Sequence, residues 1–213
     1  MPISESQLEA WSHQGATGAS ETTHQSIRAA LKAHTWPTGM TYRAYLQGSY
    51  PNFTNIRGNS DVDLVVESSA VFYSNLTNAE KQAKALSPGA FTWSDFRDEV
   101  ERALVAYYGR PSVQAFNKSI KVAPSSNRLP ADVVPAVEYQ EYQQSNLSAV
   151  GMTFWTRDNR QIINFPKLHL ENGATKNSPT RVNGWYRPTI RMFKNAREKI
   201  INGDDKIRKQ YPS

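Results

Sequence analysis

Two short stretches of the chain indicate its fold and its chemistry: QGS at residues 47–49 and DVDLVV at residues 61–66. The second stretch is β-branched and mostly apolar, which predicts a buried strand. Alternate residues of a strand point to the same face, so Asp61 and Asp63 would project together, roughly 6–7 Å apart at a rise of about 3.3 Å per residue. The apolar residues that alternate with them would face the core.

This pair of aspartates is a candidate metal site. Two neighbouring carboxylates repel each other unless a cation or water screens their charge. Mg²⁺ prefers oxygen ligands of this kind, so Asp61 and Asp63 are candidate ligands. An isolated D-x-D pair is more often a strand end that meets solvent, and the pair alone leaves that alternative open. The Gly-Ser pair shortly before it favours the metal site.

Gly48 and Ser49 predict a phosphate-binding turn. Gly48 allows the backbone to approach a ligand closely, and Ser49 offers a hydroxyl and an N–H at a predicted helix start, where Pro51 suits an early helical position. Helix N-termini bind phosphate through their free N–H groups and the local dipole. A phosphate cradle shortly before a carboxylate pair is what nucleotide chemistry requires, although Gly-Ser alone is an ordinary turn.

A third acidic residue, Asp132, lies in the apolar run ADVVPA at residues 131–136, on a predicted strand. Aspartate is rarely buried unless it is paired or bound to a metal. An edge-strand aspartate that faces water is the alternative. Together with Asp61 and Asp63, Asp132 would complete a two-metal site that positions and activates a hydroxyl nucleophile.

Helical spacing and capping residues predict four helices. They are a short helix after Ser4, one from about residue 21 to residue 36, one capped by Ser94-Asp95 and ended by Gly109, and one over residues 185–202. On the last helix, Ile190, Phe193 and Ile200 are expected to face inward.

Alternating and β-branched runs between turn residues predict seven strands. They cover residues 41–47, 62–67, 112–116, 119–123, 131–139, 152–156 and 161–164. Helices before, within and after these runs predict an α+β fold, with helices flanking a mixed, mainly antiparallel sheet.

Composition narrows the class of protein. The chain has 213 residues, of which 38% are hydrophobic, enough for one substantial domain or for one domain and part of another. It contains no apolar run of 18 or more residues, so no membrane span is expected. The absence of cysteine excludes disulfides and thiolate metal sites and, with no signal-peptide layout, favours the cytoplasm. A net charge of +6 favours an anionic partner, either nucleic acid or a free triphosphate.

The combined pattern resembles a known family. Gly48-Ser49, Asp61-x-Asp63 and Asp132 together resemble the signature of the DNA polymerase beta nucleotidyltransferase superfamily. More narrowly, the chain resembles the bacterial CD-NTases, relatives of cyclic GMP-AMP synthase and oligoadenylate synthase that make cyclic oligonucleotide signals in CBASS antiphage defence. The resemblance covers nearly the whole chain and is carried by QGSY at 47–50, TNIRGNSDVD at 54–63, ADVVP at 131–135, NFPKLH at 164–169 and RMFK at 191–194.

The resemblance implies a polymerase beta-like nucleotidyltransferase fold and a metal-dependent enzyme. Such an enzyme joins nucleoside triphosphates into a cyclic di- or oligonucleotide second messenger and releases pyrophosphate. Asp61 and Asp63 would ligate two Mg²⁺ ions, for which Mn²⁺ could substitute. Asp132 would ligate the catalytic metal and help to activate the acceptor's 2′- or 3′-hydroxyl, while the metals neutralise charge on the leaving group.

The resemblance also implies a substrate site. Gly48 and Ser49 would hold the donor triphosphate, and Lys194 matches the helix lysine of the family that contacts it. Similar sequences carry a Ser-Tyr pair in which the serine contacts phosphate and the tyrosine stacks on the base. Ser213 corresponds to that serine.

The domain organisation and partners follow from the same resemblance. Residues 1–165 would form the nucleotidyltransferase core with its N-terminal helices, and residues 166–213 the beginning of a helical C-terminal lobe, truncated because family members continue further. Nucleoside triphosphates, ATP among them, are the expected substrates. An operon-encoded effector or regulator is a candidate partner, no membrane is involved, and a monomer is expected.

Two other classes of function stay open at the level of sequence. The basic C-terminal third would serve an enzyme that adds nucleotides to RNA, a protein or a small molecule equally well. An inactive nucleotide-binding module is the non-enzymatic alternative. The three retained carboxylates argue against it, because an inactive domain has no need for a costly cluster of negative charge.

Overall fold

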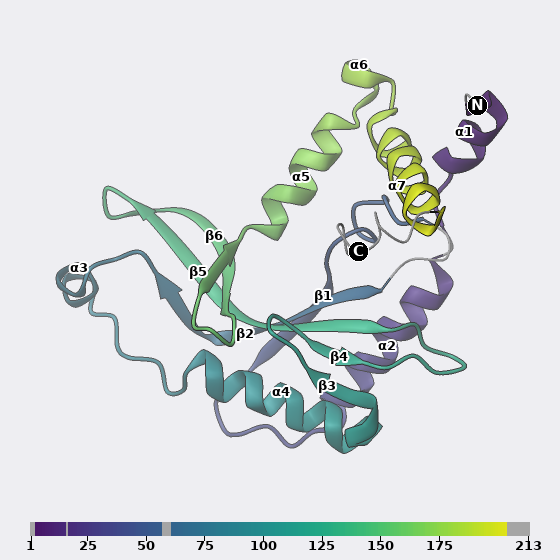
Figure 1. Ribbon diagram of the computed structural model, residues 1–213. Coiled ribbons are helices and arrows are strands. Elements are labelled where there is room, and N and C mark those ends of the chain that lie inside the picture. The colour runs from purple at the N-terminus through teal and green to yellow at the C-terminus, as the bar shows by residue number, and fades with distance from the viewer. Residues whose placement is uncertain (1–2, 16, 57–60, 204–213) are drawn as a thin grey trace. The chain divides into compact units, whose positions relative to one another are not determined.

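The computed structural model describes residues 3–15, 17–56 and 61–203, and side chains as far as residue 200 (Figure 1). Its contacts divide the chain into two compact units. We call them the sheet unit, Gly18–Gln47 with Asp61–His169, and the helical unit, Met1–Thr17 with Gly48–Ser60 and Leu170–Ser213. The predicted α+β class with a mixed sheet is confirmed.

The described part of the sheet unit contains one seven-stranded sheet. Its strands are β1 (Tyr42–Leu46), β2 (Val62–Ser74), β3 (Val113–Ala115), β4 (Ile120–Val122), β5 (Ala131–Gln143), β6 (Asn146–Trp155) and β7 (Gln161–Asn164). The order is β1-β2-β5-β4-β3, with β6 paired to the second half of β5 and to β7. Strands β2 and β5 are parallel, whereas the other pairs are antiparallel.

Two helices, α2 (Gly18–Ala33) and α4 (Trp93–Tyr108), pack against each other and against this sheet (Figure 1). Their buried side chains include Ile27 on α2 and Phe96 on α4, each with no exposed surface. The predicted inward residues of β2, Val62, Leu64 and Val66, are also fully buried, so that prediction is confirmed. A second apolar cluster, which includes Val65, Met152 and Phe154, holds the β5–β6 part of the sheet.

Two short helical segments of the sheet unit were not predicted: α3 (Asn78–Ala83) and the 3₁₀ turn η1 (Arg110–Ser112). The predicted cap of α4 was wrong. Thr92, not the Ser94-Asp95 pair, is the N-cap, and it accepts a hydrogen bond from the Asp95 peptide nitrogen at 3.2 Å. The Asp95 carboxylate accepts in return from the Thr92 peptide nitrogen at 2.8 Å, which makes a capping box.

The helical unit contains α1 (Glu5–Ser12), α6 (Pro179–Val182), α7 (Tyr186–Gly203) and most of α5 (Pro166–Lys176), whose first residues belong to the sheet unit. Ser4 caps α1 as predicted and accepts from the Gln7 peptide nitrogen at 3.3 Å. None of the described helices is long and apolar enough to cross a membrane.

The inward face predicted for α7 was wrong for two of its residues. Phe193 is 73% exposed and Ile200 is 56% exposed. The partly buried side of α7 instead carries Arg191 and Asn195, which donate hydrogen bonds to backbone carbonyls of α1. Because these polar groups satisfy carbonyls left free at the end of α1, they pack where an apolar stripe was expected.

The predicted boundary between residues 165 and 166 lies close to the unit boundary between His169 and Leu170. However, residues 1–17 and 48–60, which we assigned to the catalytic core, group with the C-terminal helices. Each unit is therefore built from segments that are distant in sequence.

Candidate active site

Two of the three predicted aspartates are direct neighbours in the sheet. In the parallel pairing of β2 with β5, Asp63 is the register partner of Asp132. Paired residues of adjacent strands share a face, and adjacent strands lie about 4.8 Å apart. Asp61 lies directly before β2, and the Asp63 carbonyl accepts a hydrogen bond from the Gln47 peptide nitrogen at 2.9 Å. Asp63 and Asp132 are far apart in the sequence, and the pairing of β2 with β5 brings them side by side.

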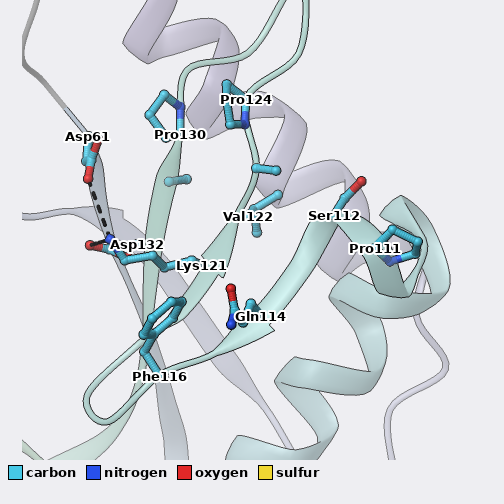
Figure 2. A pocket seen from close by; sticks show the side chains of 12 residues that line it. Asp61, Pro111, Ser112, Gln114, Phe116, Lys121, Val122, Pro124, Pro130 and Asp132 are labelled. Carbon is cyan, nitrogen blue, oxygen red and sulfur yellow. Dashed lines mark ion pairs between the residues drawn. The ribbon is translucent and has the colours of Figure 1, made fainter.

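A lysine that the sequence interpretation missed joins two of these carboxylates. The Nζ atom of Lys121 lies 3.7 Å from Oδ2 of Asp132 and 3.9 Å from Oδ2 of Asp61 (Figure 2). Lys121 belongs to β4 and is the register partner of Asp132 in the antiparallel β4–β5 pair. On its other oxygen, Asp132 accepts a hydrogen bond from the Ser119 hydroxyl at 3.1 Å. Asp132 is therefore held on both oxygens.

The electrostatics around Asp61 favour a cation. Partial burial raises the pKa of Asp61, the negative charge of Asp132 raises it further, and the positive charge of Lys121 opposes both effects. A raised pKa means that the surroundings disfavour the ionised carboxylate. Additional positive charge at this point would therefore stabilise the ionised form.

The donor set fits a hard divalent cation in its chemistry. Carboxylate oxygens are the ligands that Mg²⁺ prefers, and Asp61, Asp63 and Asp132 come together at the start of two adjacent strands. Among the described residues, no group of three acidic or histidine side chains is already arranged as a metal site. The ammonium group of Lys121 contacts two of the carboxylates and supplies part of the positive charge that a metal would supply.

The Gly48-Ser49 segment is a turn, and the predicted helix start there was wrong. Gly48 has a φ of +76° and Phe53 a φ of +57°, and both values are incompatible with a right-handed helix. The Thr54 peptide nitrogen donates to the Ser49 carbonyl at 2.9 Å, and the Asn52 side chain donates to the Gly48 carbonyl at 2.7 Å. The need for positive φ explains glycine at position 48.

Of the two remaining predicted substrate residues, the structure describes only Lys194. Lys194 of α7 donates from Nζ to the Thr54 carbonyl at 3.1 Å, so it lies beside the segment that begins with Gly48. Ser213 lies outside the described residues.

Solved structures of known enzymes resemble this fold. The c-UMP-AMP synthase CdnE of Rhodothermus marinus, solved with Apcpp and Upnpp, matches with a TM-score of 0.86 and 49% identity, over 95% of this chain and 69% of that chain. The CdnE cyclic dinucleotide synthase of Elizabethkingia meningoseptica, solved with GTP and Apcpp, matches with a TM-score of 0.74 and 31% identity, over 95% and 69%.

Curated relatives agree with these structures. A cyclic UMP-AMP synthase of Rhodothermus marinus is 51% identical over 206 residues, which is 94% of this chain and 70% of the relative. Cyclic nucleotide synthase CdnE01 of Staphylococcus haemolyticus is 36% identical over 94% of this chain and 70% of the relative. No family model matches the chain.

The fold and its structural matches define a nucleotidyltransferase with the polymerase beta-like fold. Within that class, the chain belongs to the CdnE cyclic nucleotide synthases, which are bacterial CD-NTases of CBASS defence. The chain is accordingly a nucleotidyltransferase of the type that forms cyclic nucleotides. Membership implies a reaction that depends on a divalent metal and a role in antiphage defence.

Proposed function

We propose that this chain joins ATP and UTP into a cyclic dinucleotide and releases pyrophosphate. The relative named cyclic UMP-AMP synthase is 51% identical to the chain. Relatives named for dipyrimidine and dipurine products are only 31% and 33% identical. The choice of one adenine and one uracil nucleotide rests on this difference in identity.

In this proposal Asp61, Asp63 and Asp132 are the catalytic carboxylates and hold two Mg²⁺ ions, for which Mn²⁺ can substitute. Metal ions bound there would neutralise charge on the reacting phosphates and the leaving pyrophosphate. The single observation that carries the assignment is the register pairing of Asp63 with Asp132. Asp132, whose Oδ1 is held by Ser119, is the group that helps to activate the attacking hydroxyl.

The donor triphosphate is assigned to the turn at Gly48 and Ser49. The positive φ at position 48 favours glycine, and because glycine has no side chain the backbone is open where phosphate would approach. Lys194 supplies a positive charge beside the same segment, where it now donates to the Thr54 carbonyl. Ser213 is proposed as a further phosphate contact on the resemblance alone.

The test is a product analysis with all four nucleoside triphosphates in Mg²⁺ or Mn²⁺, read by mass spectrometry and by pyrophosphate release. We expect a cyclic product that contains one AMP and one UMP. The double variant Asp61→Asn/Asp63→Asn should bind nucleotide but release no pyrophosphate. A wild type that binds ATP and UTP without releasing pyrophosphate would contradict the proposal, and extension of labelled RNA would point to the RNA-directed alternative.

The cellular setting is proposed on the same grounds. We place the enzyme in the cytoplasm as a monomer that uses free nucleoside triphosphates as substrates. Its proposed partner is an effector or regulator encoded in the same operon. RNA binding by the basic C-terminal third stays compatible with this setting and is tested by the RNA-extension measurement.

A further inference from the structure

The two carboxylate oxygens of Asp132 are held in different ways. Oδ1 accepts a hydrogen bond from the Ser119 hydroxyl at 3.1 Å. Oδ2 lies 3.7 Å from the Lys121 ammonium, which also lies 3.9 Å from Oδ2 of Asp61 (Figure 2). The first contact is a hydrogen bond from a neutral donor, whereas the second is longer than a hydrogen bond and depends on charge. A divalent cation would therefore replace the ammonium at Oδ2 and leave the contact at Oδ1 intact.

The register of β4 brings the Ser119 hydroxyl to Asp132. Lys121 is the register partner of Asp132 in the antiparallel β4–β5 pair. Ser119 precedes Lys121 by two residues, so its side chain points to the same face and reaches Asp132 along the diagonal between the strands. Ile120, between them, is fully buried and points into the core. The hydroxyl is thus supplied by backbone that the sheet holds in place.

The β3–β4 turn that carries Ser119 is also fixed from outside the hairpin. The Phe116 peptide nitrogen donates to the Ser119 carbonyl at 2.8 Å and closes the turn. The peptide nitrogen of Arg157, in the turn between β6 and β7, donates to the Asn117 side chain at 2.8 Å. The Arg157 guanidinium donates to the Ala115 carbonyl, also at 2.8 Å. All of these residues belong to the sheet unit, so the arrangement is complete within that unit.

We propose that Ser119 is a positioning residue for Asp132. Its hydroxyl fixes the carboxylate so that Oδ2 points to the position of the Lys121 ammonium, which a cation shared with Asp61 would take. The χ2 torsion of aspartate is broad, so a carboxylate without a donor at Oδ1 would sample other orientations. The inference rests on the proposed function, because it requires Asp132 to be a metal ligand.

A serine that only helps to join β4 to β5 is the alternative. In that case the Ser119 hydroxyl would contribute to the free energy of unfolding and not to metal affinity. Hydrogen-bond partners of metal ligands behave differently, because their loss typically lowers metal affinity or activity by about 10- to 100-fold. Metal affinity therefore distinguishes the two roles.

The test measures Mn²⁺ binding in the absence of nucleotide by electron paramagnetic resonance. Ser119→Val should bind Mn²⁺ roughly 10- to 100-fold more weakly than the wild type. Ser119→Thr keeps the hydroxyl on a side chain of nearly the same shape as valine, and it should bind as the wild type does. Because both replacements are β-branched, their difference isolates the hydroxyl from any effect on the backbone. Urea unfolding of both variants checks that each is folded.

The part of Arg157 is tested by a double-mutant cycle. Arg157→Met removes the donor to the Ala115 carbonyl and should weaken Mn²⁺ binding at least about twofold. The same substitution in Ser119→Val should have no further effect, because Arg157 acts through the hydroxyl that is missing there. Equal effects in both backgrounds overturn the part assigned to Arg157.

The matched control is Ser148→Ala, which removes a hydroxyl that donates to the Glu141 carbonyl at 3.0 Å between β6 and β5. It should bind Mn²⁺ as the wild type does. Wild-type affinity of Ser119→Val, or equal losses in Ser119→Val and Ser119→Thr, overturns the positioning role. That failure is distinct from failure of the proposed function, which would appear as pyrophosphate release surviving in Asp61→Asn/Asp63→Asn.

Discussion

At the scale of single residues, Lys121 places a positive charge beside two of the proposed metal ligands. Its ammonium lies within 4 Å of Asp61 and Asp132, so it would compete for the same negative charge with a divalent ion bound there. Unit charges about 4 Å apart interact by roughly 1 kcal/mol in bulk water and more strongly in a protein interior. Because Lys121 is half-exposed, we expect its attraction to the carboxylates to be close to the value in water.

We therefore expect Lys121→Met to bind Mn²⁺ more tightly, by roughly fivefold in Kd, because about 1 kcal/mol of competing attraction is lost. Mn²⁺ binding in the absence of nucleotide can be followed by electron paramagnetic resonance. Lys121→Arg, which keeps the charge, is the control and should bind as the wild type does. Weaker Mn²⁺ binding by Lys121→Met would mean that the lysine supports the site rather than competing for it.

The same residues show how far a sequence can define a site. The spacing of Asp61 and Asp63 and the apolar surroundings of Asp132 are local features, so they could be interpreted without a fold. The partners Lys121 and Ser119 could not, because their nearness to Asp132 depends on the register between β4 and β5. The available signal was that Lys121 alternates with the apolar residues Ile120 and Val122, which are buried. This pattern does not show which residue lies next to Lys121 until the neighbouring strand is known.

At the scale of elements, the capping box of α4 is a local device whose contribution can be measured. Thr92→Ala removes the side-chain acceptor at the helix start and should destabilise the protein by about 1 kcal/mol in urea unfolding. Ser94→Ala is the matched control, because Ser94 is exposed inside the first turn and should cause little change. Equal destabilisation by both substitutions would contradict the assignment of Thr92 as the cap.

Asp95, the hydrogen-bond partner of Thr92 in the capping box, makes the stability of the protein depend on pH. Hydrogen bonds from Thr92 lower the pKa of Asp95. A lowered pKa in the folded state contributes stability that is present above the ordinary aspartate range and is lost as the pH falls through the folded pKa. The difference in unfolding free energy between wild type and Asp95→Asn should therefore shrink on acidification.

Element boundaries were predictable where the pattern was local. The first strand, expected over residues 41–47, is observed over Tyr42–Leu46, and the last helix, expected over 185–202, is observed over Tyr186–Gly203. Strand β2 runs on to Ser74 because a register shift between Ser68 and Phe72 lets it continue along β5, and only the partner strand specifies that.

At the scale of the whole molecule, neither the sheet unit nor the helical unit is one continuous stretch of the sequence. The helical unit contains an N-terminal segment, the turn after β1 and the C-terminal helices, whereas the proposed catalytic carboxylates belong to the sheet unit. A boundary drawn along the sequence could not anticipate this grouping, because the links between segments are made by hydrogen bonds such as that from Asn195 of α7 to the Trp11 carbonyl of α1.

This organisation predicts that a destabilising substitution in one unit lowers the local stability of that unit and leaves the other unit largely unchanged. The Lys199 ammonium lies 5.7 Å from the Trp11 ring, so Trp11→Ala removes a ring that helps to join α1 to α7. Amide hydrogen exchange in α7 should accelerate by roughly fivefold or more, as expected for a loss of about 1 kcal/mol. Exchange in β2 and β5 should stay unchanged. Uniform acceleration across both units would show that the chain opens as a single cooperative body, and the division into units would then have no energetic meaning.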